Sequence, residues 1–350
     1  MDSSARRRPY YRRGGRVVSA VKANAHRDIR GLQPGERLED QVYRIAQKEL
    51  RTTSNGSLYI HAVLADATGQ ILGRMLNASQ ETYDTIPEGG FLHFRGRVES
   101  YRGKPQFIID GVREVDQSNF DPSAFLPTTQ YNIDDMWAET LEILRTVKQR
   151  DLLAVIGQFI NDEQFTSEFR RAPAALANHH AWLGGLLEHT LNLLRLAQVV
   201  CPLYPQINRD LVITAIFLHD AGKTRELAYS TNIEYTTDGQ LIGHITQAVI
   251  WIDQKCTAIE AETGKPFPPE IRRELLHLIL AHHGKYEYGS PRLPATPAAI
   301  LIHYLDNLDA KLNMMVDAVA NDPDDASDWT SYVRPLETKV YKPSVLPPPK

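Results

Sequence analysis

The spacing of the apolar residues changes once along this chain, and that change predicts two folding units. From Arg37 to about Val115, short runs rich in β-branched and aromatic residues alternate with turn residues, a pattern typical of strands. Beyond Met136, apolar residues recur three and four positions apart in successive segments, which predicts helices. The pattern therefore predicts an all-β domain followed by an all-α domain.

The strand-rich unit has the element order of an OB-fold. The second expected strand, Leu58 to Asp66, alternates apolar and polar positions, and Ile71 to Leu76 returns after the turn ATGQ. A short helix fits Ser79 to Thr85, ahead of the strands in FLHFRGRVESY and PQFIIDGV. Five short strands with one helix between the third and fourth are typical of an OB-fold, a barrel that often binds oligonucleotides.

These patterns predict five segments: a basic flexible arm (1–36), the OB-fold (37–116), a linker with prolines (117–136), the helical domain (137–320) and a C-terminal tail (321–350). Residues 1–30 contain nine Lys or Arg and two Asp, a formal charge of +7 in a chain whose total is −4. This arm could neutralise phosphates, or it could be a solubilising tail.

Several classes of protein are excluded by composition. The longest apolar run, Leu211 to Leu218, is far shorter than the roughly eighteen residues of a membrane helix, and no secretory signal is visible at the N-terminus. We therefore expect a cytoplasmic protein with no membrane partner. Cys201 and Cys256 lie far apart, so neither a disulfide framework nor a zinc ribbon is expected. Any metal must be held by nitrogen and oxygen.

Histidines concentrate in the helical half, where nine of the twelve fall between His179 and His303. Metal-capable side chains lie on expected buried helix surfaces or at helix ends: His189, the dipeptide His219-Asp220, His244, the pair His282-His283, and Asp306. Burial of such groups without partners is costly, whereas two cations that share Asp220 would satisfy them. Each histidine taken singly is more often a structural residue than a ligand, so the prediction depends on the set.

His189, His219-Asp220 and Asp306 match the H…HD…D signature of the HD superfamily of metal-dependent phosphohydrolases. With His244 and His282-His283, the ordered set resembles the two-metal branch of that superfamily. The segments HHAWLGGLLEHT, FLHDAGKTREL, IGHI, LAHHGKYEYGSPRLPAT and HYLDNLDAKLN are similar to bacterial YhaM-type 3′-to-5′ exoribonucleases. Members of that family also carry an OB-fold ahead of the HD domain, so the resemblance implies an N-terminal all-β OB-fold followed by an all-α HD domain.

The resemblance also implies a ligand set and a reaction. One metal would be held by His189, His219, Asp220 and Asp306, and a second by Asp220, His244, His282 and His283. Such sites suit manganese, which we favour over iron, cobalt, nickel and magnesium. Lys223 is the second catalytic candidate beside Asp220, because it could touch the scissile phosphate; alternatively it is a cation at a helix end. Relatives assemble, so the resemblance implies a homo-oligomer.

The expected OB-fold offers aromatic and basic side chains for single-stranded nucleic acid. The candidates are Tyr59, His61, His93, Arg95, Arg97, Tyr101, Arg102 and Lys104. An ordinary solvated face and a protein-binding module are the alternatives.

The combined expectation is a metal-dependent 3′-to-5′ exoribonuclease that hydrolyses single-stranded RNA to nucleoside 5′-monophosphates. Ligand spacing by itself supports only phosphoester hydrolysis, and the RNA substrate and the polarity come from the resemblance. The alternatives are a hydrolase of small nucleotides, cyclic dinucleotides or single-stranded DNA, and a noncatalytic nucleic-acid-binding protein.

Overall fold

The protein is described by a computed structural model in which two compact units are distinguished, residues 1–127 with 230–232, and residues 128–229 with 233–350. The structure describes residues 26–53, 55–87, 89–101, 103–115, 125–176, 181–229, 233–320, 322 and 327–343. Residues 1–25 of the expected arm, Arg102, His179 and His180 lie outside the described residues. Among the described residues, no helix is long and apolar enough to cross a membrane.

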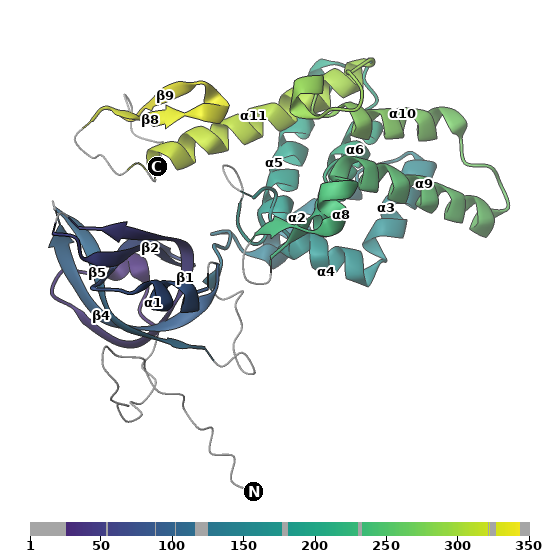
Figure 1. The fold of residues 1–350 in the computed structure, drawn as a ribbon. Coiled ribbons are helices and arrows are strands. Elements are labelled where there is room, and N and C mark those ends of the chain that lie inside the picture. Colours follow the sequence, from purple (N-terminus) through teal and green to yellow (C-terminus); the bar gives the residue numbers. More distant parts are fainter. Residues whose placement is uncertain are drawn as a thin grey trace, which may run out of the picture. The chain divides into compact units, whose positions relative to one another are not determined.

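The first unit is a closed five-stranded barrel (Figure 1). Its elements are β1 (Arg37–Thr52), β2 (Leu58–Asp66), β3 (Gly69–Leu76), α1 (Gln80–Thr85), β4 (Phe91–Tyr101) and β5 (Lys104–Glu114). The strand order is β1-β2-β3-β5-β4, with β3 parallel to β5 and the other pairs antiparallel. This topology, with a helix between β3 and β4, is that of an OB-fold and confirms the expected class.

The period-two pattern of the strands places apolar side chains inside the barrel. Ile60, Ala62 and Leu64 of β2 are buried, whereas Tyr59 and His61 between them are only partly buried. Irregular pairing between Ile45 and Gln47 marks a bulge in β1. Bulges bend a strand, which allows one strand to pair with β2 along one part and with β4 along another.

The basic arm was expected to extend to residue 36, but the last part of that segment belongs to the barrel. Ile29, in the short 3-10 helix η1 (Ile29–Gly31), and Leu32 are buried in the barrel core. The backbone N–H of Ile29 donates to Asp66 Oδ2 at 2.8 Å. Sequence pattern misses this segment because two apolar residues without periodicity look like a loop, although both pack into the barrel core.

The second unit is helical. Its longer helices are α2 (Ile133–Leu144), α3 (Arg150–Ile160), α4 (Glu163–Arg171), α5 (Gly185–Val200), α6 (Arg209–Leu218), α9 (His244–Thr263), α10 (Pro269–Ala281) and α11 (Pro297–Ala320). Short elements between α6 and α9 are α7 (Lys223–Glu226), β6 (Leu227–Ala228), β7 (Glu234–Tyr235) and α8 (Thr237–Leu241). Helices α5 and α6 are the most deeply buried elements of this core, and α6 is apolar on all sides.

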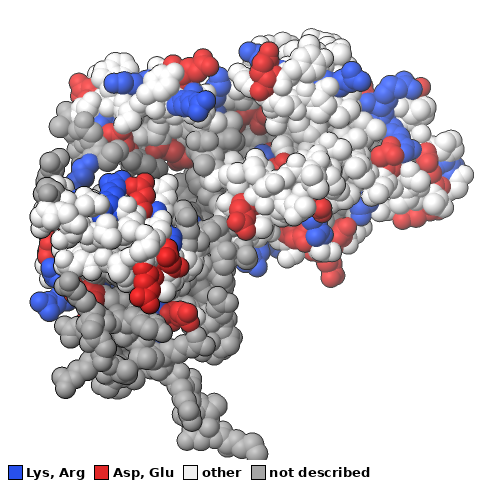
Figure 2. Space-filling view, in the orientation of Figure 1, with Lys and Arg blue, Asp and Glu red and all other residues white. Residues whose placement is uncertain are grey.

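Two other expected boundaries differ from the structure. Helix α2 starts inside the predicted linker, because the Asn132 side chain caps it by accepting from the N–H groups of Asp134 and Asp135. The predicted tail contains a hairpin of β8 (Trp329–Val333) and β9 (Thr338–Tyr341), which contacts α11. Figure 2 shows basic and acidic side chains interspersed over the described surface on one face.

Candidate metal centre

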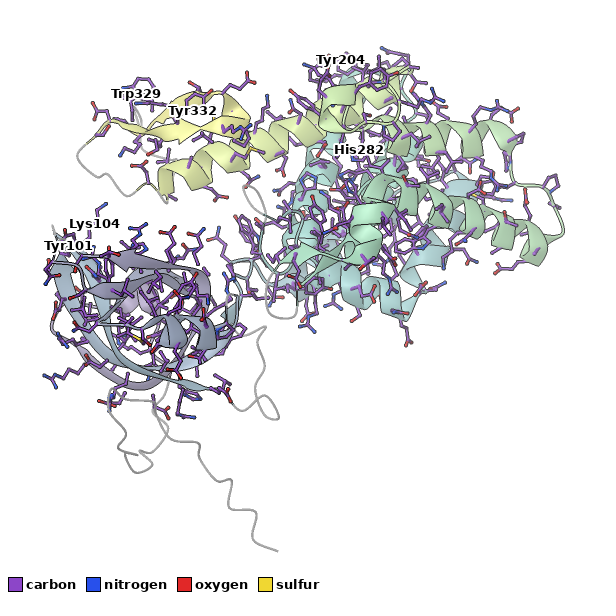
Figure 3. The ribbon with its side chains drawn as sticks, viewed as in Figure 1. Tyr101, Lys104, Tyr204, His282, Trp329 and Tyr332 are labelled. Carbon is purple, nitrogen blue, oxygen red and sulfur yellow. The ribbon has the colours of Figure 1, made fainter. Side chains whose placement is uncertain are left out.

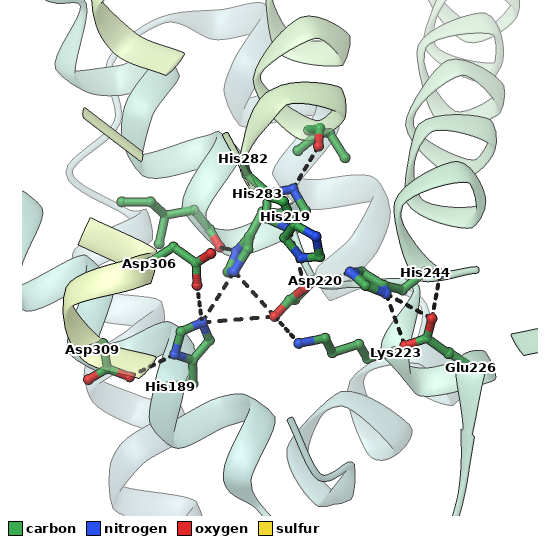
Figure 4. Close-up of polar contacts among 12 residues, drawn as sticks. His189, His219, Asp220, Lys223, Glu226, His244, His282, His283, Asp306 and Asp309 are labelled. Atoms are coloured by element: carbon green, nitrogen blue, oxygen red, sulfur yellow. Dashed lines mark hydrogen bonds and ion pairs between the residues drawn. The ribbon is translucent and has the colours of Figure 1, made fainter. Parts of the chain in front are cut away.

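The structure brings together all seven side chains that were predicted to hold metal (Figure 4). They come from the middle of α5, the end of α6, the start of α9, the end of α10 and the middle of α11: His189, His219, Asp220, His244, His282, His283 and Asp306. Two groups of three have ligand atoms within 4.8 Å of one another, His189 with His219 and Asp220, and His244 with His282 and His283. Helices far apart in sequence therefore deliver one polar cluster into an otherwise apolar core.

Asp220 lies at the centre of the cluster, and its two carboxylate oxygens face different partners. Oδ2 lies 3.3 Å from Nε2 of His219 and 3.8 Å from Nε2 of His189. Oδ1 lies 3.4 Å from Nε2 of His244 and 3.7 Å from Nε2 of His282. A carboxylate in this position can bridge two cations, one beside each oxygen.

The outer ring nitrogens of the histidines are all engaged, which aims the inner nitrogens at the centre. Nδ1 of His219, His282 and His283 donates to the backbone carbonyl oxygens of Ile216, Ile279 and Tyr288, at 2.7, 2.7 and 2.8 Å. A donating Nδ1 places the lone pair on Nε2, and this is how metal-binding histidines are usually oriented.

Carboxylates orient the other two histidines. His189 Nδ1 lies 2.7 Å from Asp309 Oδ2, and His244 Nδ1 lies 2.8 Å from Glu226 Oε1. Asp309 lies one turn after Asp306 on α11, yet its carboxylate contacts His189 rather than Asp306. Glu226 was missed altogether, and its position in FLHDAGKTREL, six residues after Asp220, is the only signal that the sequence holds.

Several atoms at the centre are buried without a hydrogen-bond partner among the described residues. They are Asp220 Oδ1, His244 Nε2 and His282 Nε2. Leaving buried polar atoms unpaired costs free energy, about 1–3 kcal/mol each. Three unpaired acceptors that face one another are satisfied by a cation, so the donor set fits a metal better than a purely structural network.

Electrostatics keep the ligands in the required charge states. Burial lowers the pKa of His282 well below its usual value, and the neighbouring His283 and His219 add to the effect, so the ring is neutral. Burial alone would raise the pKa of Asp220, but Lys223 and the surrounding histidines outweigh it and hold that pKa well below the usual range. Neutral imidazoles and ionised carboxylates are the forms that bind cations.

His189 behaves differently, because two carboxylates surround it. Burial lowers its pKa, but hydrogen bonds to Asp306 and Asp309 outweigh burial and raise the pKa to about 10. The Nε2 atom lies 3.2 Å from Asp306 Oδ1, so the negative charge that favours a proton there equally favours a metal cation. A proton and a metal are therefore alternative occupants beside this nitrogen, and a metal bound there would displace the proton.

Lys223 is the first residue of α7 and lies three positions after Asp220. Its ammonium Nζ is 2.7 Å from Asp220 Oδ2, and only 12% of the side chain is exposed. Burial lowers the pKa of Lys223, but the Asp220 charge and hydrogen bond raise it above the usual value, so the ammonium stays charged. The predicted site lysine thus points at the cluster rather than into solvent.

The described candidates for nucleic-acid binding make two separate sets of contacts on the barrel. The Arg74 guanidinium lies over the rings of Tyr101 and Tyr59, with its carbon 4.8 and 5.7 Å from their centroids, and Arg74 pairs across the strands with His61. Lys104 pairs with Tyr101 in the turn between β4 and β5. We call Tyr59, His61, Arg74, Tyr101 and Lys104 the aromatic platform.

The other described candidates, His93, Arg95 and Arg97, lie further back along β4, the strand that ends at Tyr101. His93 Nδ1 is 2.9 Å from Asp40 Oδ1, a largely buried carboxylate that also accepts from Arg113. Arg97 makes ion pairs with Glu99 and Asp110, at 2.7 and 3.1 Å. Arg95 shares this outer side of β4. Strand alternation predicted which side chains point outward, but barrel closure decides which of these outward positions are neighbours.

Fold and site together define the class: an OB-fold barrel followed by an HD domain, which is a metal-dependent hydrolase domain. Residues 186–311 match the family described as HD domain. The chain is 32% identical to the 3′-5′ exoribonuclease YhaM of Bacillus subtilis, over 87% of this chain and 95% of the relative. The corresponding protein of Halalkalibacterium halodurans is 30% identical, over 92% of this chain and 98% of the relative. That of Bacillus pumilus is 33% identical, over 83% of this chain and 90% of the relative. This chain belongs to the YhaM family.

Solved structures that are similar to part of the chain include the second OB-fold domain of replication protein A from Methanococcus maripaludis. The alignment covers 27% of this chain and 100% of that chain, with 18% identity and a TM-score of 0.21.

Replacing Glu226 with alanine is expected to weaken metal binding by about 10- to 100-fold, a range typical of groups that orient metal ligands. The Glu226 carboxylate accepts from both Nδ1 and the backbone N–H of His244, so its loss frees the ring to rotate. Titration calorimetry with Mn²⁺ measures the effect, with Glu270→Ala on the exposed first turn of α10 as the matched control. Equal affinity of the two variants would contradict the orienting role.

Proposed function

We propose that this chain is a metal-dependent 3′-5′ exoribonuclease that shortens single-stranded RNA and releases nucleoside 5′-monophosphates. The observation that carries the proposal is the convergence of five histidine Nε2 atoms and two carboxylates on one point, with the Nδ1 atom of every ring already engaged. Membership of the YhaM family supports the RNA substrate and the 3′-5′ polarity.

The proposed centre holds two divalent cations, with manganese favoured. His189, His219, Asp220 and Asp306 would hold one, and Asp220, His244, His282 and His283 the other. The division follows the two oxygens of Asp220, which face different histidines. Bound cations supply Lewis-acid stabilisation of the negative charge that develops during phosphodiester hydrolysis. A donor set of five imidazoles and two carboxylates suits manganese better than magnesium.

Lys223 is proposed to contact the scissile phosphate. Its ammonium uses one N–H on Asp220 and has two more to donate, and it lines the cavity beside the cluster. The raised pKa keeps it charged, so it can pair with a nonbridging phosphate oxygen. Asp220 in turn holds the ammonium in place.

The aromatic platform is the proposed entry surface for RNA on the barrel. Tyr101 is 47% exposed, and both tyrosines contact the Arg74 guanidinium, so aromatic rings and positive charge lie side by side. Figure 3 shows Tyr101 and Lys104 together at one end of the barrel. Exposed rings beside cations bind single strands through base stacking and phosphate pairing.

Replacing Tyr101 with alanine is expected to lower the affinity for a single-stranded oligoribonucleotide by about 1–3 kcal/mol, the contribution typical of one stacked base. Tyr101→Phe retains the ring and should bind like the unmodified protein. Tyr204 on the helical unit is 48% exposed, so Tyr204→Ala is a matched control for removal of a surface tyrosine (Figure 3). Fluorescence anisotropy without added metal measures binding, and equal losses in both alanine variants would move the RNA path elsewhere.

The activity itself is tested with a 5′-labelled single-stranded RNA, purified protein and Mn²⁺. We expect a ladder that shortens from the 3′ end, and we expect no shortening when the 3′ end is blocked. Internal cleavage of the blocked RNA would indicate an endonuclease instead. Intact RNA that still binds would exclude the proposed substrate and point to small nucleotides.

A further inference from the structure

A cavity of about 840 Å³ adjoins the metal-binding cluster, and the C-terminal hairpin forms one of its walls. Asp220, Lys223 and Asp306 line it at the end where the histidines converge. Lys311 on α11 and the residues Arg334–Glu337 line it elsewhere. These last residues are the connection between β8 and β9, so a segment expected to be a surface tail reaches the proposed active site.

The hairpin is built to hold its connecting turn in place. Thr330 and Val340 are buried, and the N–H of Val340 donates to Thr330 Oγ1 at 2.9 Å. Asp322, which follows α11, accepts from Ser331 N–H and pairs with Lys342, at 3.0 and 3.1 Å. These contacts tie both strands to the end of α11, alongside which the hairpin lies (Figure 1).

One residue of the turn, Glu337, has a left-handed backbone conformation, which costs free energy for a residue other than glycine. Residues Arg334–Leu336 form the short 3-10 helix η6, and Glu337 after it has a φ of 54°. Residues other than glycine rarely adopt this left-handed region, and such positions cluster at binding and catalytic sites. Glu337 allows the chain to turn back into β9 while η6 faces the cavity.

The lysine and arginine side chains that line the cavity differ in whether they have an anionic partner. Lys223 is paired with Asp220. The nearby carboxylate of Glu226 is engaged by His244. In contrast, Arg334 and Lys311 form no ion pair with any residue that the structure describes, and both are exposed. Two cations that have no anionic partner among the described residues, in the same cavity as the metal-binding cluster, are placed to meet an anionic ligand.

We propose that Arg334 and Lys311 bind the phosphates of the RNA strand that lie on the 5′ side of the scissile bond. This inference rests on the proposed exoribonuclease function and adds a role for the hairpin. In 3′-5′ hydrolysis, the scissile phosphate lies at the cluster, and the retained strand continues with one negative charge for each nucleotide. The guanidinium of Arg334 donates to phosphate oxygens in a fork geometry, and the ammonium of Lys311 acts as a point charge.

The test compares two RNA substrates with the full-length protein and Mn²⁺. A pentanucleotide has phosphates on the 5′ side of the scissile bond, whereas a dinucleotide with a free 5′ hydroxyl has only the scissile phosphate. For the pentanucleotide, Arg334→Ala is expected to raise KM about tenfold with a much smaller change in kcat. The loss of kcat/KM for the dinucleotide should be smaller than that for the pentanucleotide.

Salt dependence and conservative replacement give independent readouts. Arg334→Ala should reduce the slope of log KM against log salt concentration by about 1, the change for one lost phosphate contact. Arg334→Lys should recover part of the affinity, and Lys311→Ala should act in the same direction as Arg334→Ala. Lys339→Ala removes a positive charge from an exposed position of β9 outside the cavity lining, and it serves as the matched control.

The outcomes separate this inference from the function on which it rests. An unmodified protein that does not shorten the pentanucleotide would overturn both. If the unmodified protein is active and Arg334→Ala has the kinetics of Lys339→Ala, only the role of the hairpin is overturned. Equal losses for the dinucleotide and the pentanucleotide would also overturn it, because they would indicate a disturbed catalytic centre.

Discussion

Asp220→Ala is expected to abolish RNA hydrolysis, with a loss in kcat of about 10³-fold or more, because the cations that it is proposed to hold would supply several kcal/mol of transition-state stabilisation. Each oxygen of this carboxylate faces a different group of histidines, so its removal affects both proposed metal positions. Metal content measured by mass spectrometry should fall together with the rate. RNA affinity should persist, since the proposed entry surface lies on the barrel.

The matched control for this variant is Asp135→Ala, the same change at an exposed position in the first turn of α2. It should retain activity and metal. Circular dichroism and thermal melting must show that Asp220→Ala is folded, because the substitution leaves several histidines around an empty position. Hydrolysis by Asp220→Ala at the rate of the control would refute the assignment of the centre.

Gly222→Ala is expected to reduce activity and metal affinity by about 100-fold, although residue 222 is not proposed to contact substrate. Misplacement of a reacting group by 1 Å can lower a rate about 100-fold. A Cβ at Gly222 would lie 2.1 Å from the carbonyl oxygen of His244, far inside contact distance. Because the obstructing atoms belong to the backbone, the start of α9 must shift, and His244 moves with it.

Gly157→Ala is the control for this prediction. Gly157 lies within α3, and a Cβ there meets no atom within 4 Å. The same substitution should therefore stabilise the protein by about 0.5–1 kcal/mol through helix propensity, without changing activity. Comparison of kcat and manganese affinity between the two variants isolates the steric effect, and unaltered catalysis in Gly222→Ala would contradict it.

The ligand set illustrates what can be predicted from local sequence. His219 and Asp220 follow a helix that is apolar on every side, and His189 lies within another apolar helix, so burial of these polar groups follows from the hydrophobic pattern. Their arrival at one point was predicted from the order of the motifs and the family resemblance. Helical periodicity specifies which face of each helix is buried, but it does not specify which helices meet.

The supporting residues show where this kind of prediction ends. Glu226 orients His244 from 18 positions away, and Asp309 orients His189 from 120 positions away. Each pairing depends on how two helices or turns pack against each other. No local pattern distinguishes Glu226 from the exposed acids of the chain, and helical spacing relates Asp309 to Asp306 rather than to His189. Similarly, the closed barrel brings Arg74 of β3 against Tyr101 at the end of β4, a contact that strand alternation does not specify.

By itself, the sequence determined the order of the two domains, the residue types at the metal centre and the helices that present them, because these depend on short-range periodicity and on the chemistry of His and Asp. Only the tertiary structure decided how the two oxygens of Asp220 are shared, which groups engage each Nδ1 and how the Arg334–Glu337 turn comes to line the cavity. These features arise from contacts between segments distant along the chain. Their geometry is set by packing of the whole core.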